Sequence, residues 1–343
     1  MRNFIIAIGL LLGVIFLASN FTEVEQITAT LQRGDWRFIL LSVLLVLVWL
    51  VNMAASYKTI FHVIGIEETL SQLLILTAAA TFINVIAPSA GIGGMSVFIA
   101  EARQKGKTGA RALVAGALFV IFDYLGFFLL LSLGLIVLFR RNILGGTEIT
   151  ASVILFFMFT GMSLLLYLGF KSEQALADAL AWLARAGNRL LKPLRRHKKF
   201  SEEEARSIAH DAVGGLNELR NRPLDLIYPF LLAISNKLLL LLIFFLTFKA
   251  FQVPASIGIL IAGTSLSYLF LIVSPTPYGL GVVEGVLTLA LRSMYIPVSD
   301  ALVITIAYRG VIFWIPFLLG AVSIRWVGKP AEEKLDRSPE AID

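Results

Sequence analysis

Six long, uninterrupted apolar stretches limit this chain to folds that cross a membrane as helices. A membrane-spanning helix needs about 20 predominantly apolar residues, and backbone groups in lipid must be hydrogen-bonded internally, which makes these stretches helices rather than strands. Charged residues make up only 15% of the chain, against roughly 25% in soluble domains. We therefore predict an all-α polytopic integral membrane protein. Its full spans are expected at about 3–20, 38–57, 110–139, 149–170, 224–248 and 300–324.

Two further apolar stretches, 70–100 and 256–291, are broken near the middle by proline and glycine. Proline lacks a backbone donor and stops a helix, whereas glycine permits turns that other residues resist. Non-helical backbone at membrane depth is tolerated only inside protein or beside a water-filled cavity. Each stretch is therefore predicted to be a re-entrant helical hairpin. The first break contains Asn84, Pro88, Gly93 and Gly94, and the second contains Pro275, Pro277, Gly279, Gly281 and Glu284.

The distribution of lysine and arginine predicts how the chain is oriented. The connector after the first hairpin, the central connector 171–222 and the tail 326–343 are basic, and the central connector alone holds eleven such residues. Cytoplasmic loops carry this excess. The hairpins must then open to opposite faces, which makes 38–139 and 223–325 an inverted repeat, the usual sequence pointer to a transport site near the midplane. In the alternative topology, 256–274 crosses fully and the chain has eight or more spans.

The whole chain, 1–343, is predicted to form a single transmembrane domain with both termini in the cytoplasm. Residues 1–37 are expected to be a signal anchor and an outer loop, because no clear small-x-small cleavage site follows the first apolar run. A cleaved signal peptide is the alternative for this region. Residues 140–170 provide an extra span outside the repeat.

The central connector has the pattern of an amphipathic helix. Leucines recur in it at helical spacing beside Trp182, with basic residues on the other faces. This pattern fits an interfacial helix that lies on an anionic leaflet through residues 171–199. A solvated linker helix is the alternative.

Four ionisable residues lie deep in the predicted membrane segments: Asp123, Lys237, Glu284 and Arg309. A charge at the bilayer centre costs at least about 2.5–3.5 kcal/mol, so each side chain must face protein or water. Two structural pairs, Asp123 with Lys237 and Glu284 with Arg309, would cancel these charges. The functional alternative is a polar cavity that binds a charged headgroup or coupling ion. Half-helices that start after Pro88 and Pro277 would aim free N–H groups at the same depth, where an anion is favoured.

Several classes of function lack their residues in this sequence. There are no cysteines, and the three histidines have no metal-ligand spacing, so neither a metal nor a cofactor is expected. Gly106-Lys107-Thr108 is not preceded by the glycine and strand of a phosphate-binding loop, and no catalytic motif appears. We therefore expect no enzymatic activity. The net charge of +6 is concentrated in a few loops, so membrane orientation explains it better than nucleic-acid binding.

From about residue 40 to 325, the chain resembles the flippase-like membrane family typified by the transmembrane region of lysylphosphatidylglycerol synthases. The resemblance implies movement of lipids between leaflets, in the typical member of an aminoacylated phospholipid, without a cofactor. The chain departs from the family at Met95–Phe98, which lacks the arginine that often follows the first Gly-Gly. It also lacks the soluble aminoacyl-transferase domain of the full synthases, so aminoacyl transfer is not expected. The residues that carry the resemblance are Asn84, Pro88, Gly93, Gly94, Arg103, Gly106, Pro275, Pro277, Gly279, Leu280, Gly281, Glu284 and Arg309.

Together these observations predict a flippase-like transporter of the bacterial or archaeal inner membrane that moves a phosphate-bearing lipid between leaflets. The alternatives are a membrane-embedded enzyme that acts on lipid headgroups and a non-transporting scaffold in envelope-lipid synthesis. The sequence sets neither the lipid nor the oligomeric state. The expected substrate-binding residues are Asn84, Pro88, Gly93, Gly94, Asp123, Lys237, Pro275, Pro277, Gly279, Gly281, Glu284 and Arg309.

Overall fold

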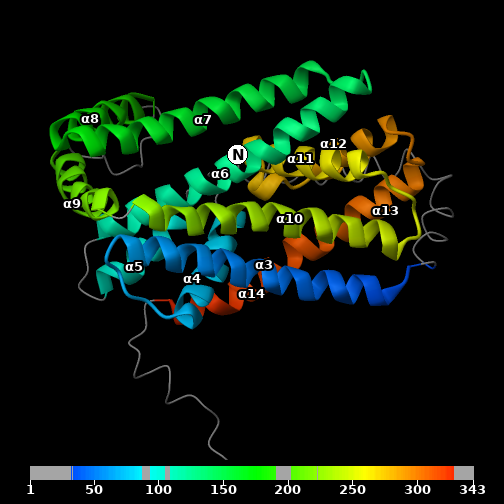
Figure 1. The fold of residues 1–343 in the computed structure, drawn as a ribbon, viewed down its shortest axis with the longest axis horizontal. Helices are drawn as coiled ribbons and strands as arrows, with labels where there is room; N and C mark the ends of the chain where they lie inside the picture. Colours follow the sequence, from blue (N-terminus) through cyan, green and yellow to red (C-terminus); the bar gives the residue numbers. More distant parts are fainter. Residues whose placement is uncertain are drawn as a thin grey trace, which may run out of the picture.

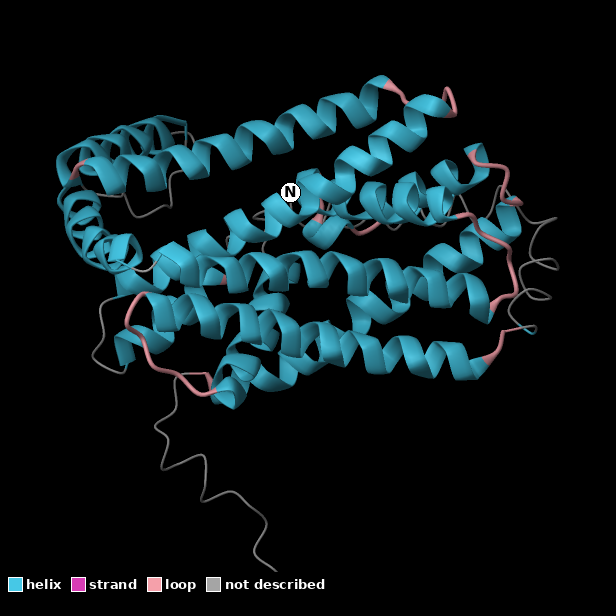
Figure 2. Ribbon diagram, in the orientation of Figure 1, coloured by secondary structure: helices cyan, strands magenta, loops and turns pink. Residues whose placement is uncertain are grey.

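The computed structural model describes residue 32 and residues 34–86, 93–104, 109–190, 202–221 and 223–327. Every regular element in these ranges is a helix, and the long helices lie side by side (Figures 1 and 2). Five helical segments are long and apolar enough to cross a membrane, which confirms the predicted fold class and five of the six predicted spans. The sixth, 3–20, lies outside the described residues. The five segments are Trp36–Val63, Arg111–Arg140, Gly146–Lys171, Leu224–Ala250 and Val298–Trp326.

The termini of the long helices lie at the two ends of the bundle, and two hydrogen bonds show which termini lie at the same end. The backbone N–H of Asp35, just before α3 (Trp36–Val63), donates to the carbonyl of Ala250, the last residue of α10 (Ile227–Ala250), at 2.8 Å. Arg141, just after α6 (Gly109–Arg140), donates to the Ser256 hydroxyl at 3.3 Å. The start of α3 and the ends of α6 and α10 therefore lie at one end of the bundle.

Both broken apolar stretches form a helix, a break and a second helix. The first consists of α4 (Leu70–Ile86) and α5 (Met95–Gln104). The second consists of α11 (Ile257–Val273), a 3₁₀ turn at Pro277–Gly279 and α12 (Val282–Ser293). Figure 1 shows that α12 runs back beside α11 towards the end where α11 begins, whereas α5 returns towards the opposite end, where α3 ends and α6 begins. The two hairpins therefore open to opposite ends.

The packing of the helices follows an inverted repeat. The last span divides into α13 (Val298–Arg309), a π-helical turn at Gly310–Trp314 and α14 (Ile315–Ser323). Helix α3 packs against its counterpart α10, α4 packs against α14, and α11 packs against α6. In addition, α5 packs against α6 and α12 packs against α13. Exchanging the two halves of the chain maps these contacts onto one another, as an inverted repeat requires.

In the described part of the chain, three helices lie outside the repeat. The extra span, α7 (Gly146–Lys171), leaves large apolar side chains such as Phe156 and Phe157 exposed, as expected for a helix that faces lipid. The amphipathic connector forms α8 (Glu173–Leu190) and α9 (Glu202–Asn221), which pack against each other.

The regularly spaced apolar residues of the connector do not form one solvent-exposed face. Leu176 is buried among residues of the protein core, including Leu216 of α9, whereas Trp182 and Leu183 are exposed. Helical periodicity alone cannot separate a face that packs on a neighbouring helix from a face that meets lipid. Only Trp182 and Leu183 therefore remain as apolar contacts for a membrane surface among the described side chains of α8.

Candidate functional site

A cavity of about 110 Å³ lies where the two broken stretches approach each other. Its wall comes from α3, α4, α6, α11 and the second break. Since about 10–15 Å³ is enough for one water molecule, the cavity has room for several waters or a small polar group. The polar and aromatic members of the wall are Trp49, Tyr57, Thr77, Thr81, Asn84, Phe119, Asp123, Tyr124, Tyr268, Ser274, Thr276 and Tyr278.

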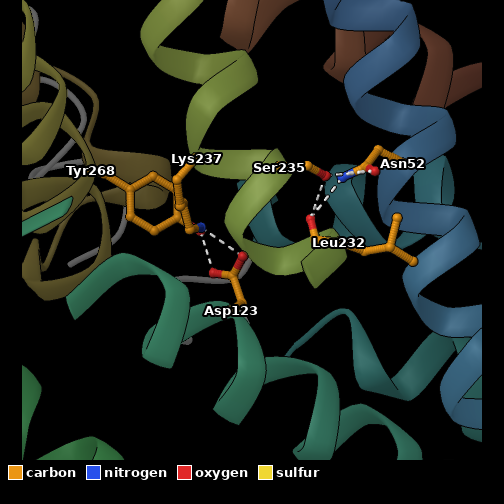
Figure 3. A network of polar contacts seen from close by, with 6 residues as sticks. All are labelled: Asn52, Asp123, Leu232, Ser235, Lys237 and Tyr268. Atoms are coloured by element: carbon orange, nitrogen blue, oxygen red, sulfur yellow. Dashed lines mark hydrogen bonds and ion pairs between the residues drawn. The ribbon is translucent and has the colours of Figure 1, made fainter. Parts of the chain in front are cut away.

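One member of a buried ion pair, Asp123, forms part of this wall. The Lys237 ammonium on α10 lies 2.6 Å from Oδ1 of Asp123 on α6. Oδ2 of the same carboxylate accepts a hydrogen bond of 2.5 Å from the Tyr268 hydroxyl on α11. The ammonium also lies 3.7 Å from the centre of the Tyr268 ring, and Figure 3 shows the three side chains facing one another. Only 4% of Lys237 and 9% of Asp123 is exposed, so the pair is buried within the protein.

A second polar contact holds α10 on its other side (Figure 3). The Ser235 hydroxyl donates to Oδ1 of Asn52 on α3 at 3.0 Å, and the Asn52 amide donates to the carbonyl of Leu232 at 2.9 Å. Two residues before Lys237, α10 is thus bound to α3 through side chains. This contact helps to set the rotation of α10 that directs Lys237 towards α6.

The second break has an irregular backbone that its glycines permit. Gly279 and Gly281 have φ angles of +70° and +80°, and a Cβ on Gly279 would come within 3.2 Å of the Leu271 Cα. Tyr278 adopts φ +51°, which is uncommon for a residue with a side chain and costs about 1–3 kcal/mol. The break also holds the Ser274 hydroxyl 2.8 Å from the Thr276 hydroxyl, beside the cavity.

The second ion pair fixes the shape of this break. Nε of Arg309 donates to Oε1 of Glu284 at 2.7 Å, while Nη2 of Arg309 donates to the Tyr278 carbonyl at 3.0 Å. The other carboxylate oxygen of Glu284 accepts a 2.7 Å bond from the backbone N–H of Gly281, just before α12. Arg309 is only 3% exposed, and its Nη1 has no hydrogen-bond partner among the described residues.

In the described part of the first break, an amide side chain connects the two helices. Oδ1 of Asn84 accepts a 2.6 Å hydrogen bond from the backbone N–H of Gly94, and Asn84 also lines the cavity. A Cβ on Gly94 would lie 2.8 Å from the Asn84 side chain, so glycine is needed for this close packing. The carbonyl of Gly93 accepts from the Ser96 hydroxyl at 2.7 Å. Pro88 lies outside the described residues.

One expectation about the site is wrong in part. The half-helices begin at Met95 and Val282, after the two prolines, but the N–H groups of Gly94 and Gly281 just before them donate to Asn84 and Glu284. Side chains of the same hairpin thus accept hydrogen bonds from two N–H groups that were expected to be free for a ligand. Backbone donors without a helical partner at the start of a helix are normally capped in this way. Pro275 and Pro277 shape the turn.

The four ionisable residues predicted deep in the membrane segments form two separate pairs rather than one cluster. The partners are those that charge cancellation predicts: Asp123 with Lys237, and Glu284 with Arg309. Among the described residues that line the cavity, Asp123 is the only charged one. Tyr278 connects the pairs, because its side chain lines the cavity and its carbonyl binds Arg309.

Sequence reasoning missed the aromatic residues of the cavity wall. These residues lie in apolar segments, and hydrophobicity alone does not distinguish them from lipid-facing or core residues: Trp49, Tyr57, Tyr124 and Tyr268. A signal was present, because tyrosine and tryptophan in membrane helices are enriched at the interfaces, and a buried tyrosine hydroxyl usually has a partner. A tyrosine near the centre of an apolar segment, such as Tyr268, therefore indicates a polar neighbour.

The sequence model of the lysylphosphatidylglycerol synthase TM region matches residues 4–320. The chain belongs to this family. The match includes both broken hairpins and both ion pairs, so the cavity lies within the lysylphosphatidylglycerol synthase TM region. The chain is also similar to a UPF0104 membrane protein of Pyrococcus horikoshii, at 25% identity over 94% of this chain and 96% of the relative. A UPF0104 membrane protein of Methanothermobacter thermautotrophicus is 21% identical over 96% of this chain and 97% of the relative.

Proposed function

We propose that this protein moves a phosphate-bearing lipid between the leaflets of a bacterial or archaeal cytoplasmic membrane. The observation that carries the proposal is the cavity between two oppositely opening hairpins, with the carboxylate of an ion pair in its wall. Transporters built from inverted repeats bind their substrates at such interrupted segments, near the midplane. Membership of the family supports a role that involves lipids.

The buried cations support a phosphate as the group that is bound. Lys237 reaches the cavity wall through Asp123, and Arg309 lies behind Tyr278 with a buried nitrogen that lacks a partner among the described residues. Charge-assisted hydrogen bonds to phosphate are about twice as strong as neutral ones, and a low-dielectric surrounding increases the attraction. Binding and release at this site need no covalent chemistry and no cofactor, so the proposal is transport without enzymatic activity.

The proposed transport is tested with protein reconstituted in liposomes that contain a fluorescent phospholipid. Lys237→Gln should slow transbilayer movement by at least about tenfold, because the variant loses the charged partner of a buried phosphate. Lys249→Gln is the matched control, since Lys249 is exposed on the same helix and lies over the Phe245 ring. Thermal unfolding of both variants verifies that they are folded. Unchanged movement in Lys237→Gln, or movement of phosphate-free lipids alone, would refute the proposal.

The proposed orientation places the end of the bundle with α8 and α9 in the cytoplasm. The basic connector lies at this end, and the exposed Trp182 and Leu183 would rest on the anionic inner leaflet through 171–199. Both termini would then be cytoplasmic.

Because the chain has no cysteine, single cysteines can test this orientation. Gly65→Cys and Gln104→Cys, at the two ends of the first hairpin, should react with a membrane-impermeant maleimide only from the cytoplasmic side. Tyr295→Cys, in the connector after α12, should react only from outside, since Tyr295 is strongly exposed. Labelling of Gln104→Cys from outside would contradict the inverted repeat.

A further inference from the structure

We infer that the cavity selects a net-neutral zwitterionic headgroup, with one ammonium for each phosphate, which inserts between Lys237 and Asp123. This inference rests on the proposed function and adds a substrate class to it. In the occupied state the headgroup ammonium pairs with Asp123, and the phosphate pairs with Lys237. One internal ion pair is thereby replaced by two pairs between the protein and the lipid.

The surroundings of Asp123 have the chemistry of an ammonium site. Its carboxylate lines the cavity, and an ammonium already binds it at 2.6 Å while lying 3.7 Å from the centre of the Tyr268 ring. A carboxylate beside an aromatic face is the usual recognition site for an organic ammonium group. Trp49, Tyr57 and Tyr124 add further aromatic surface to the wall. Lys237 thus occupies, as an internal ligand, a place that fits the amine of a headgroup.

The Asp123 carboxylate stays in position when Lys237 leaves it for a phosphate. The Tyr268 hydroxyl holds Oδ2 of Asp123 independently of Lys237, so the acceptor keeps its position when the ammonium changes. Lys237 reaches the site on a flexible four-carbon stem, which allows its ammonium to follow a phosphate. Arg309 supplies an additional donor behind Tyr278, because its Nη1 is buried and has no partner among the described residues.

Charge balance is the reason for selection. The wall is neutral, since the single charged lining residue in the described part of the cavity is paired with one lysine. An anionic headgroup would separate the pair and leave Asp123 buried without a cation, whereas a headgroup with excess positive charge would leave one cation without a partner. Uncompensated buried charges are strongly destabilising. A headgroup with one ammonium and one phosphate leaves no charge unpaired.

The test is competitive binding to the purified full-length protein, measured by native mass spectrometry with lipids that have identical acyl chains. The three probes are phosphatidylethanolamine with no net charge, phosphatidylglycerol with a net negative charge and its lysyl ester with a net positive charge. The wild-type protein should bind phosphatidylethanolamine at least about tenfold more tightly than either charged lipid. Equal binding, or preference for a charged lipid, would overturn the inference.

Two single variants should shift the preference in opposite directions. Asp123→Asn leaves Lys237 unpaired and should favour phosphatidylglycerol, whereas Lys237→Gln leaves Asp123 unpaired and should favour the lysyl ester. Lys249→Gln should keep the wild-type order. If both cavity variants keep that order, these residues do not select the headgroup, and the inference fails even where the wild-type ranking holds.

Binding and transport fail in distinguishable ways. If reconstituted protein moves phosphatidylglycerol as fast as phosphatidylethanolamine, the zwitterion inference is refuted and the proposed lipid transport stands. If the predicted binding order holds but no lipid crosses the bilayer, the proposed transport is refuted and the headgroup site stands.

Discussion

The two buried ion pairs differ in how firmly the protein holds them. Asp123 and Lys237 connect two continuous helices, and the Lys237 ammonium donates to Asp123 and to no other group among the described residues. Glu284 and Arg309 are tied to the backbone of the second break, because Glu284 accepts from Gly281 N–H and Arg309 donates to the Tyr278 carbonyl. Among the described residues, the first pair is held by side-chain contacts, whereas both members of the second pair are also bonded to the backbone.

Under the proposed function, this difference would give the two cations distinct roles. Arg309 would be a fixed donor, since it can add a bond through Nη1 without giving up Glu284. Lys237 would be an exchangeable donor, since it must leave Asp123 to bind a ligand. The π-helical turn at Gly310–Trp314 and the positive φ of Tyr278 occur beside the fixed pair. Irregular backbone of this kind clusters at functional sites and persists where surrounding contacts hold it.

The largest expected effect is the loss of Arg309. Arg309→Met should lower the free energy of unfolding by about 3–5 kcal/mol, because Glu284 is left without its cation and the Tyr278 carbonyl loses a donor. Thermal or denaturant unfolding in detergent measures this loss. Wild-type stability in this variant would show that the pair does not hold the second break.

The double variant Glu284→Gln/Arg309→Met tests whether Arg309 serves more than the fold. Glutamine still accepts from Gly281 N–H, so this variant should regain most of the stability, and more of it than Glu284→Leu/Arg309→Met. Its lipid transport should stay impaired because the fixed donor is absent. Recovery of both stability and transport would make the pair purely structural.

A smaller effect is expected at the exchangeable pair. Asp123→Asn and Lys237→Gln should each reduce the free energy of unfolding by about 1–3 kcal/mol, since the partner that remains lies beside a cavity that admits water. The double variant should be less destabilised than the sum of the two, with a coupling energy of about 0.5–3 kcal/mol. A double-mutant cycle of unfolding free energies measures this coupling. Additive effects would show that the two residues are not paired in the folded protein.

The sequence was sufficient to predict the framework of the fold. Span length, together with proline and glycine in two apolar stretches, predicted the helices and both breaks, because these signals are local. The partners of the buried charges followed from charge cancellation. The expectation of free N–H groups at the half-helices was wrong for Gly94 and Gly281, since capping by Asn84 and Glu284 depends on how each hairpin folds back.

The composition of the cavity wall was not predictable in the same way. Tyr57, Tyr124 and Tyr268 come together from α3, α6 and α11, and only the packing of these helices decides which of their faces meet. The division of the amphipathic stripe in α8 has the same cause, because Leu176 is covered by another part of the chain. Contacts between distant segments, rather than local propensity, account for what the sequence left open.

The smallest expected effect separates the hydroxyl of Tyr268 from its ring. Tyr268→Phe removes the donor to Oδ2 of Asp123 but keeps the aromatic face over Lys237, so the free energy of unfolding should fall by about 1 kcal/mol. Tyr268→Leu also removes the cation–π contact and should cost a further ~0.5–2 kcal/mol. Tyr167→Phe is the matched control, because Tyr167 is exposed on α7 and its change should leave stability within about 0.5 kcal/mol of wild type. Unfolding curves for the three variants measure these differences, and liposome assays should show slower lipid movement in Tyr268→Phe. A Tyr268→Phe variant with wild-type stability and transport would mean that the Asp123 carboxylate keeps its position without the hydroxyl. Tyr268 would then not be the residue that holds Asp123 in place when Lys237 exchanges its partner.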